Sequence, residues 1–295
     1  MTDVLVGVDA GGSKCAVRVE TVDGHRIADV VYEAEDWAAE PAASAAAWLR
    51  DRVDRATGGD HVTAIGVGAQ GCDSAALAAE LSRELSALGS PALVVNDAAL
   101  LVPGAGLDSG IGVIAGTGSI AVGTTAAGEP VHAGGWGWVI GDEGGGAALV
   151  REAAKAALAA HDRGEPDDGL LATLLAEFAV ADAERLARAV NDDPTIPNWA
   201  PKAPSVFRAA DGGSALAVAV IEDAADALAD IVDRVKAKGA LGETVVAAGS
   251  VIASQPRLLE GLRERVALRH PGHRVVLLDD EPVAGGVALA RRIAG

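Results

Sequence analysis

Aromatic residues, cysteines and positive charges are scarce in this chain of 295 residues. Phe, Trp and Tyr together make up 3% of the sequence, so its apolar half consists mostly of Ala and Val, and the five Trp stand out. The two cysteines, Cys15 and Cys72, match no zinc-ligand spacing, and free thiols of this kind indicate a reducing compartment. The net charge of −18 argues against nucleic acid or an anionic membrane as a partner, because both are bound by clustered Lys and Arg.

Long hydrophobic runs and a basic leader are also missing. No apolar run reaches the roughly 18 residues that a membrane span needs. The N-terminus, MTDVLVGVDAGG, passes straight into an expected strand without the basic segment of a signal peptide. We therefore expect a cytoplasmic protein. The acidic balance leaves a nucleotide possible as a ligand, because Mg²⁺ and backbone N–H groups can hold its phosphates.

The sequence contains an internal repeat. Gly7–Val17 (GVDAGGSKCAV) and Gly112–Val122 (GVIAGTGSIAV) match at six of eleven positions, at a constant offset of 105. Each copy reads as a strand, a glycine-rich turn and a second strand, followed by a further turn in which Gly24 or Gly128 suits a hairpin. The repeat predicts a duplicated domain.

Strands and helices alternate along the rest of the chain, which favours sheets covered by helices. The patterns predict helices over 44–56, 75–88, 146–160, 211–238 and 285–293, and strands over 61–69, 91–95, 243–248 and 273–278. Between about 162 and 210, helical pieces are broken by RGEPDDG and NDDPTIPNWAPKAP. This region is interpreted as a helical insertion.

The two repeated glycine turns are candidate phosphate-binding sites. A glycine turn between strands lets the backbone approach an anion and direct several N–H groups at it. A single turn of this kind is weak support, because strands need turns anyway. Two such turns at equivalent positions of a duplicated domain are expected to face each other across a cleft. Further glycine turns occur over 247–252 and 283–290.

These motifs resemble a known superfamily. VGVDAGGSK (6–14) is similar to the first phosphate motif of the sugar kinase, Hsp70 and actin ATPases, VIAGTGSIAVG (113–123) to the second, and VVAAGSVI (245–252) to the adenosine motif. The segment 134–158, GGWGWVIGDEGGGAALVREAAKAAL, resembles the signature of the N-acetylglucosamine kinase family, grouped with the BadF/BadG-type ATPases. The resemblance covers nearly the whole chain.

The resemblance implies an α/β fold of two ribonuclease H-like domains flanking a nucleotide cleft. The N-terminal domain would comprise residues 1–107 and the C-terminal helix, about 284–295. The C-terminal domain would comprise residues 108–283, with the helical insertion over about 162–210. In such a protein the two domains close over a sugar and exclude water.

The resemblance also implies roles at the nucleotide. Asp9 would approach Mg²⁺, directly or through water. The residues assigned to the phosphates and to the adenosine are Gly11, Gly12, Ser13, Lys14, Gly116, Thr117, Gly118, Ser119, Gly249, Ser250, Gly285 and Gly286. For Lys14 a solvated surface position is an equal alternative, and for Gly285 and Gly286 the alternative is an ordinary joint before a final helix.

Asp97 is the candidate catalytic base. It follows the strand 91–95, where a carboxylate can take the proton of a sugar hydroxyl as that oxygen attacks the γ-phosphate. The matching Asp is the base in the resembled kinases. An alternative role for Asn96 or Asp97 is to cap the next helix, and the two roles can coexist.

The resemblance assigns a sugar site from both domains. Its residues would be Glu35, Trp37, Gln70, Gly71, Asp73, Asn96, Asp97, Thr117, Gly134, Gly135, Asp142 and Glu143. Glu143 could instead cap the helix that begins near Gly146, and core packing is favoured over sugar contact for Trp136 and Trp138. Glu35 occupies a position where the relatives have Asn, and a carboxylate there could attract a free amine, unless it is only a solvated charge.

The sequence therefore predicts an ATP- and Mg²⁺-dependent kinase of an amino sugar, N-acetylglucosamine or glucosamine, acting at the 6-hydroxyl and assembling as a homodimer. One alternative is an ATPase that activates a redox enzyme. Those dimers hold an iron–sulfur cluster with cysteines from the segment joining the two halves, and here 96–118 contains no Cys. Another alternative is a non-catalytic sugar sensor.

Overall fold

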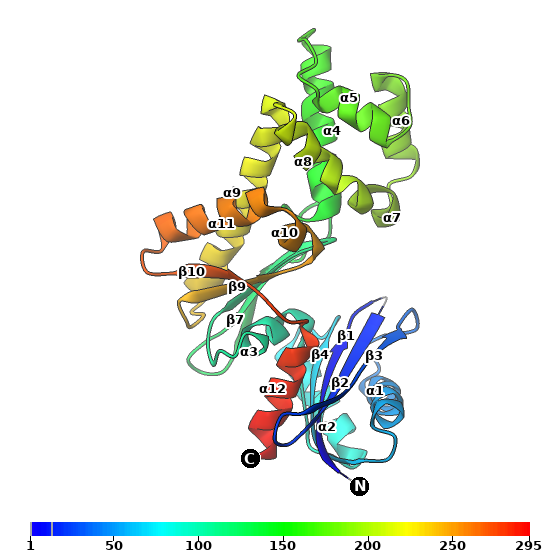
Figure 1. Ribbon diagram of the computed structural model, residues 1–295, viewed down its shortest axis with the longest axis vertical. Helices are drawn as coiled ribbons and strands as arrows, with labels where there is room; N and C mark the ends of the chain where they lie inside the picture. The colour runs from blue at the N-terminus through cyan, green and yellow to red at the C-terminus, as the bar shows by residue number, and fades with distance from the viewer. Residues whose placement is uncertain (1, 13) are drawn as a thin grey trace.

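The computed structural model describes residues 2–12 and 14–295. It has two lobes, each built around a five-stranded sheet (Figure 1). The first sheet has the order β3-β2-β1-β4-β5 and the second the order β10-β9-β6-β7-β8. In both, a hairpin pair of antiparallel strands continues into parallel strands, so β6 corresponds to β1 and β10 to β5. The predicted duplication is confirmed.

The bounds of the strands follow the sequence patterns closely. The first sheet contains β1 (Asp3–Ala10), β2 (Lys14–Thr21), β3 (Arg26–Glu33), β4 (His61–Ala69) and β5 (Ala92–Asn96). The second contains β6 (Ile111–Ala115), β7 (Ser119–Thr124), β8 (Pro130–Gly134), β9 (Thr244–Ala248) and β10 (Arg274–Leu277). Gly24 and Gly128 have φ of +97° and +80°, as the predicted hairpin turns require.

Helices cover the two faces of the first sheet. Because strand side chains alternate, Val6 and Val8 of β1 face α1 (Ala42–Thr57) and α2 (Ala75–Ala87), whereas Leu5 faces α12 (Val283–Ala294). The last helix therefore lies against the sheet formed by the start of the chain, and both termini lie in this lobe (Figure 1).

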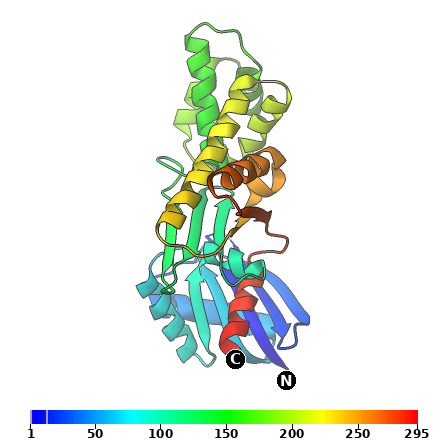
Figure 2. The same ribbon diagram turned by 90° about the vertical axis from the view of Figure 1, so that its left-hand side faces the viewer.

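The packing of α12 depends on glycine. A Cβ on Gly7 of β1 would lie 2.5 Å from the Val283 carbonyl oxygen, and one on Gly66 of β4 would collide with the Gly286 carbonyl. The absence of side chains lets the helix lie directly on the strands. Figure 2 shows α12, in red, alongside the strands of this sheet.

The second lobe is largely helical outside its sheet. It contains α4 (Gly146–Asp162), α9 (Ala215–Ala237), α10 (Ser250–Ser254) and α11 (Pro256–Arg269). In the region read as an insertion lie α5 (Leu170–Glu177), α6 (Ala183–Asp192), α7 (Ile196–Trp199), η2 (Ala200–Lys202) and α8 (Ala203–Asp211). The predicted helix over 211–238 begins later than expected, because Asp211 ends α8, and the sequence reading missed α11.

A short helical segment joins the lobes. η1 (Asp97–Leu100) and α3 (Leu101–Gly104) follow β5, and η1 contacts both β4 of the first sheet and β6 and β7 of the second. A Cβ on Gly112 of β6 would lie 3.0 Å from the Ala98 carbonyl oxygen. Asp97 consequently starts its helix at the junction of the two sheets.

The second connection between the lobes runs from β10 to α12 and is held by ion pairs. Arg18 of β2 is 1% exposed, and it pairs with Asp29 of β3 at 3.0 Å and with Asp280 of the connection at 2.6 Å. Two carboxylates thus satisfy a buried guanidinium.

None of the helices formed by residues 2–12 and 14–295 combines the length and hydrophobicity that crossing a membrane requires.

Candidate active site between the two lobes

Asp97 and Asp9 form the acidic centre of the candidate site. Burial is the main cause that raises the pKa of Asp97, and a hydrogen bond from the Ala98 N–H opposes it. Burial also raises the pKa of Asp9, at the end of β1, to about 7, with further contributions from the charges of Asp97 and Glu281. The two lobes meet around carboxylates whose negative charge is poorly solvated.

Two side chains cap the start of η1. The Ala98 N–H donates to Asn96 Oδ1 at 3.0 Å and to Asp97 Oδ1 at 2.9 Å. Asn96 is the N-cap, and its amide also donates to Asp73 Oδ1 at 2.9 Å. The structure therefore brings Asp73, Asn96 and Asp97 together, and Asp97 remains partly exposed.

Glu281 is a candidate site residue that the sequence analysis did not predict. It lies in the connection between β10 and α12, and its charge acts on Asp9. The available signal was the acidic run 279–281 directly after the last strand, because the carboxyl end of a parallel strand is where side chains from several connections meet.

In the first glycine turn, Gly12 is the exposed glycine. Gly11 uses its N–H to donate to the Lys14 carbonyl at 3.0 Å, and Lys14 is exposed at the start of β2. A Cβ on Gly12 would lie 2.7 Å from Gln70 Oε1, so this side chain covers the turn. Ser13, also assigned to the phosphates, lies outside the described residues.

The second glycine turn offers fewer groups than predicted. Gly116 is buried and donates its N–H to the Gly118 carbonyl at 3.0 Å. Ser119 is 5% exposed, and its hydroxyl donates to the Glu143 carbonyl at 2.7 Å. These polar groups are used within the lobe in this structure, and the assignment of Gly116 and Ser119 to the phosphates stays a prediction. Thr117 and Gly118 remain accessible.

The predicted adenosine motif lies directly behind the second turn. Gly249 has a φ of +113°, and a Cβ there would lie 2.5 Å from the Ala115 carbonyl oxygen. Ser250 is exposed and lines a cavity of about 190 Å³. The other walls come from η2, α8 and the end of α10, with Pro201, Pro204, Phe207, Ser254 and Gln255 among them. From the sequence, 199–207 was predicted only as part of the helical insertion.

Gly285 and Gly286 do not belong to this cavity. Both are buried in α12, where a Cβ on Gly285 would collide with the Leu100 carbonyl and one on Gly286 would lie 2.7 Å from the Gly66 carbonyl oxygen. These glycines serve close backbone packing within the first lobe, and their assignment to the adenosine pocket stays a prediction.

Around Trp37, the first-lobe residues assigned to the sugar are adjacent. The Trp37 indole donates to the Gln70 carbonyl at 3.1 Å. Gly71 follows with a φ of +82°, which turns the chain from β4 toward Asp73. Glu35 is exposed, two residues before Trp37.

The segment 134–143 is folded back on the second glycine turn. Gly134 and Gly135 have φ of +81° and +73°, and the Gly135 N–H donates to the Ser119 carbonyl at 2.9 Å. Asp142 has a φ of +58° and accepts from the Gly137 N–H at 3.2 Å. Its carboxylate lies against Gly118, and burial raises its pKa.

The two tryptophans of this segment have different surroundings. Trp138 packs on Trp199 with ring centroids 4.9 Å apart, which agrees with the predicted core role. Trp136 is 70% exposed, so the core prediction is wrong for that residue. The neighbouring Val139 and Ile140 are exposed as well.

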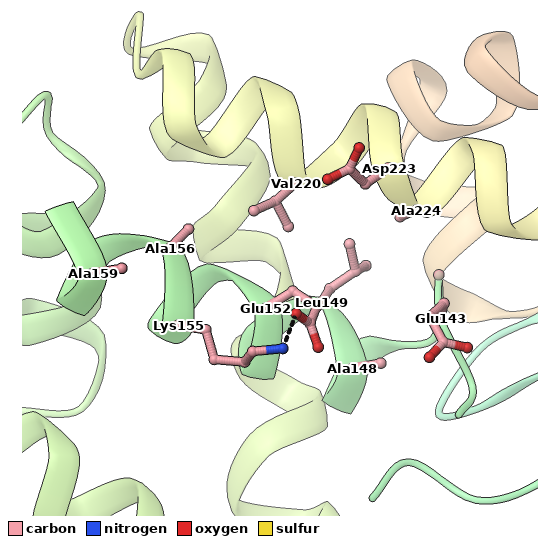
Figure 3. Close-up of a pocket in the computed structure, with 11 residues that line it drawn as sticks. Glu143, Ala148, Leu149, Glu152, Lys155, Ala156, Ala159, Val220, Asp223 and Ala224 are labelled. Carbon is pink, nitrogen blue, oxygen red and sulfur yellow. Dashed lines mark hydrogen bonds and ion pairs between the residues drawn. The ribbon is translucent and has the colours of Figure 1, made fainter. Parts of the chain in front are cut away.

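The Glu143 side chain lies beside α4. Its carboxylate pairs with Arg151 at 3.5 Å and lines a cavity of about 640 Å³ between α4 and α9 (Figure 3). Helix α4 has Gly145 as its N-cap, without a side-chain cap, so the alternative role of Glu143 as a cap is wrong. Across the described part of the chain, no three His, Cys, Asp or Glu side chains form a group able to hold a metal ion by themselves.

Two curated relatives are similar in sequence. An N-acetylmuramic acid/N-acetylglucosamine kinase from Clostridium acetobutylicum is 33% identical over 172 residues, 55% of this chain and 56% of the relative. An N-acetyl-D-glucosamine kinase from Dictyostelium discoideum is 28% identical over 188 residues, 61% of this chain and 59% of the relative. The alignments thus span little more than half the length of these relatives.

A solved structure matches along the whole chain. The crystal structure of a provisionally named N-acetylglucosamine kinase from Chromobacterium violaceum superposes with a TM-score of 0.72 and 25% identity, over 98% of this chain and 99% of that one. The predicted two-lobed α/β fold is confirmed.

A family profile matches nearly the whole chain. The profile of the BadF/BadG/BcrA/BcrD ATPase family matches residues 6–287, from the first strand to the last helix. This range includes both glycine turns, Asp97 and the segment 134–143, which carried the resemblance in the sequence. The chain belongs to the BadF/BadG/BcrA/BcrD ATPase family.

Proposed function

We propose that this chain transfers the γ-phosphoryl group of ATP to the 6-hydroxyl of an amino sugar, N-acetylglucosamine or glucosamine. The observation that carries the proposal is the position of Asp97, a partly buried carboxylate at the junction of the lobes, with its charge close enough to raise the pKa of Asp9. Phosphoryl transfer needs positioning and charge neutralisation rather than extensive covalent chemistry.

In the proposed reaction Asp97 accepts the proton of the sugar hydroxyl. The deprotonating oxygen forms a bond to the γ-phosphorus while the bond to the bridging oxygen of ADP breaks, and ADP leaves with the electron pair. A raised pKa makes the ionised carboxylate a stronger base than an ordinary Asp. The Ala98 N–H donates to both Asn96 Oδ1 and Asp97 Oδ1. These hydrogen bonds support the role of Asp97, since they fix the position of its carboxylate.

Asp9 would hold Mg²⁺, directly or through water. The fit rests on the position of this carboxylate, near the carboxyl end of β1 and beside the first glycine turn. The charges of Asp97 and Glu281 also act on it, and a cation would stabilise its ionised form. When bound, Mg²⁺ would offset the negative charge of the phosphates. Glu281 is the second carboxylate that acts on this position.

The phosphates would lie between Gly12 of the first glycine turn and Thr117 and Gly118 of the second. Lys14 would add a positive charge beside them. Adenine would enter the cavity of about 190 Å³ beside Ser250, whose Pro and Phe walls suit a flat apolar ring. In this proposal 1–107 with about 284–295 closes as one body on 108–283.

The sugar would bind beside Asp97, against Trp37, Asp73 and Asn96, with Asp142 and the 134–135 backbone approaching from the second lobe. Exposed Glu35 favours a free amine at the sugar and so keeps glucosamine beside N-acetylglucosamine. We also propose a cytoplasmic homodimer. The two buried, unpaired cysteines agree with a reducing compartment, and light scattering on the purified chain tests the dimer.

The test is a coupled ADP-release screen with Mg²⁺-ATP. The panel contains N-acetylglucosamine, glucosamine, N-acetylmannosamine, N-acetylmuramic acid and glucose. We expect turnover of N-acetylglucosamine or glucosamine, with the product's phosphate on O6 by ³¹P–¹H NMR. ADP release at the same rate with and without every sugar would contradict the proposal. Iron analysis of anaerobically purified protein then tests the redox-activator alternative, for which stoichiometric iron is required.

A further inference from the structure

Three side chains of the first lobe form a layered contact, the Trp37–Trp48–Arg52 stack. Trp37 and Trp48 have ring centroids 5.0 Å apart at an interplanar angle of 55°. The Arg52 guanidinium carbon lies 3.5 Å from the centre of the Trp48 ring. Trp48 and Arg52 lie one helical turn apart on α1, and Trp37 lies in the loop that precedes this helix.

The stack is tied to the candidate sugar site at its Trp37 end. The Trp37 indole donates to the Gln70 carbonyl at 3.1 Å, and the Gln70 side chain covers Gly12 of the first glycine turn. At its other end, Arg52 pairs with Asp36 at 3.6 Å. The loop carrying Glu35 is therefore held at two consecutive residues, Asp36 by Arg52 and Trp37 by Trp48.

Hydrogen bonding alone does not account for the stack. Among the described residues, Trp48 Nε1 and Arg52 Nε are buried and have no hydrogen-bond partner. Leaving a buried donor unpaired costs free energy, so such a donor requires another explanation. Stacking provides it, because the attraction between a guanidinium and an indole face strengthens as water is excluded.

We propose that Trp48 and Arg52 are positioning residues for sugar binding, which act by holding Trp37 and the Glu35–Trp37 loop in the geometry that the sugar meets. The inference rests on the proposed function, since it assigns Trp37 to the sugar. It predicts that changes behind Trp37 alter sugar affinity and leave ATP affinity unchanged. A purely structural role would lower stability and leave the affinities for both substrates alone.

The experiment measures sugar binding by calorimetry, and the KM for sugar and for ATP, with N-acetylglucosamine and glucosamine as probes. Trp48→Leu removes the ring, and Trp48→Phe keeps a ring but no N–H. Arg52→Met removes the cation. Two controls on α1 match these changes: Leu49→Ala removes core volume at a fully buried position, and Arg55→Met removes a cation that pairs with Asp51.

We expect Trp48→Leu to weaken sugar binding about tenfold and Arg52→Met about threefold, as the loss of stacking implies. Trp48→Phe should restore most of the affinity, and the ATP KM should stay within about twofold throughout. Leu49→Ala should lower the melting temperature without changing sugar affinity, and Arg55→Met should change neither.

The outcomes separate the two proposals. If the wild type binds sugar and Trp48→Leu binds it equally well, the positioning role is overturned and the kinase proposal stands. An equal rise in the KM for sugar and for ATP also overturns it. If the wild type neither binds nor phosphorylates any sugar of the panel, the kinase proposal fails first, and the positioning role fails with it.

Discussion

The two lobes have sheets of the same strand order, but different side chains cover their glycine turns. In the first lobe Gln70, from the loop after β4, lies over Gly12. In the second lobe Asp142, from the segment between β8 and α4, lies against Gly118. The Gln70 side chain is neutral and its loop is exposed, whereas the Asp142 carboxylate accepts a hydrogen bond from the Gly137 N–H.

The comparison teaches that duplication reproduces the backbone and not the chemistry. Both copies end the equivalent strands β1 and β6 in a glycine turn, yet Asp9 of the first corresponds to Ile114 of the second. The acidic residues that surround Asp9 come from η1 and from the β10–α12 connection, where the lobes meet. The proposed chemistry therefore depends on connections that the repeat does not contain.

The largest expected effect concerns the carboxylate after β5. Asp97→Asn should lower kcat about 10³-fold, since it removes the proposed proton acceptor, while the Kd values for ATP and sugar change little. The matched variant is Asp279→Asn, which alters an exposed carboxylate after β10, the counterpart of β5. It should keep normal activity. Undiminished transfer by Asp97→Asn would remove Asp97 from the role of base.

The next effect concerns the packing of α12 on the first lobe. Gly285→Ala should lower the free energy of unfolding by about 3 kcal/mol, because its Cβ collides with the Leu100 backbone. Gly128→Ala, in a second-lobe hairpin with open space and a φ of +80°, should cost about 1 kcal/mol from backbone strain. Urea unfolding measures both. Equal costs would mean that α12 can shift to accept the methyl group.

Asp9→Asn should stabilise the protein in a pH-dependent way. The pKa of Asp9 rises from 3.8 to about 7 on folding, so ionisation opposes folding and wild-type stability falls as the pH rises through this window. Removing the charge should therefore add about 2 kcal/mol above pH 7, less than the roughly 4 that three pKa units represent, since the group is partly exposed.

This gain should shrink as the pH falls from 7 to 4, because the folded carboxyl is protonated in this range, and it should vanish only below pH 3.8, where the unfolded carboxyl is protonated as well. Urea titrations without Mg²⁺ at pH 4.5, 6 and 8 measure it. A gain that is independent of pH would show that the side-chain amide acts through a new contact. The same variant should lose Mg²⁺-dependent turnover.

The smallest expected effect compares the two glycine turns directly. Gly118→Ala would press on Asp142, whose carboxylate the Gly137 N–H holds, and it should raise the KM for ATP about tenfold. Gly12→Ala would press on the end of the Gln70 side chain, which can rotate away, so a rise of about twofold is expected. Steady-state kinetics decides. A larger effect at Gly12 would reverse the comparison.

Much of the fold could be predicted from local patterns. The strand over 61–69 has the bounds that the apolar run indicates, and the hairpin glycines have the positive φ that their turns require. Helix α11 was missed because its buried apolar side chains, Leu258, Leu259, Leu262 and Val266, form a narrow face among many charged residues.

The candidate site was harder to predict, because its hydroxyl groups and glycines make contacts with residues that lie far away in the sequence. Ser119 has the residue type and place of a phosphate ligand, but its hydroxyl donates to the Glu143 carbonyl. Gly285 and Gly286 match a ligand-facing glycine pair, yet backbone from Gly66 and Leu100 occupies the space. Such pairings depend on packing between segments, which local sequence does not encode.

By itself the sequence determined the duplicated strand–turn–strand units, the alternation of strands and helices and the acids at the strand ends, because these depend on side-chain periodicity and on glycine's backbone freedom. Only the tertiary structure decided which groups remain available to a ligand. Burial and hydrogen bonding used Gly116, Ser119, Gly285 and Gly286 internally, brought Glu281 to Asp9, and left Thr117, Gly118 and Asp97 accessible. The physical reason is that a polar group that hydrogen-bonds within the protein is not free to bind a ligand, and that the space beside a glycine holds either a ligand or another segment of the chain. Which of the two occurs depends on the tertiary packing.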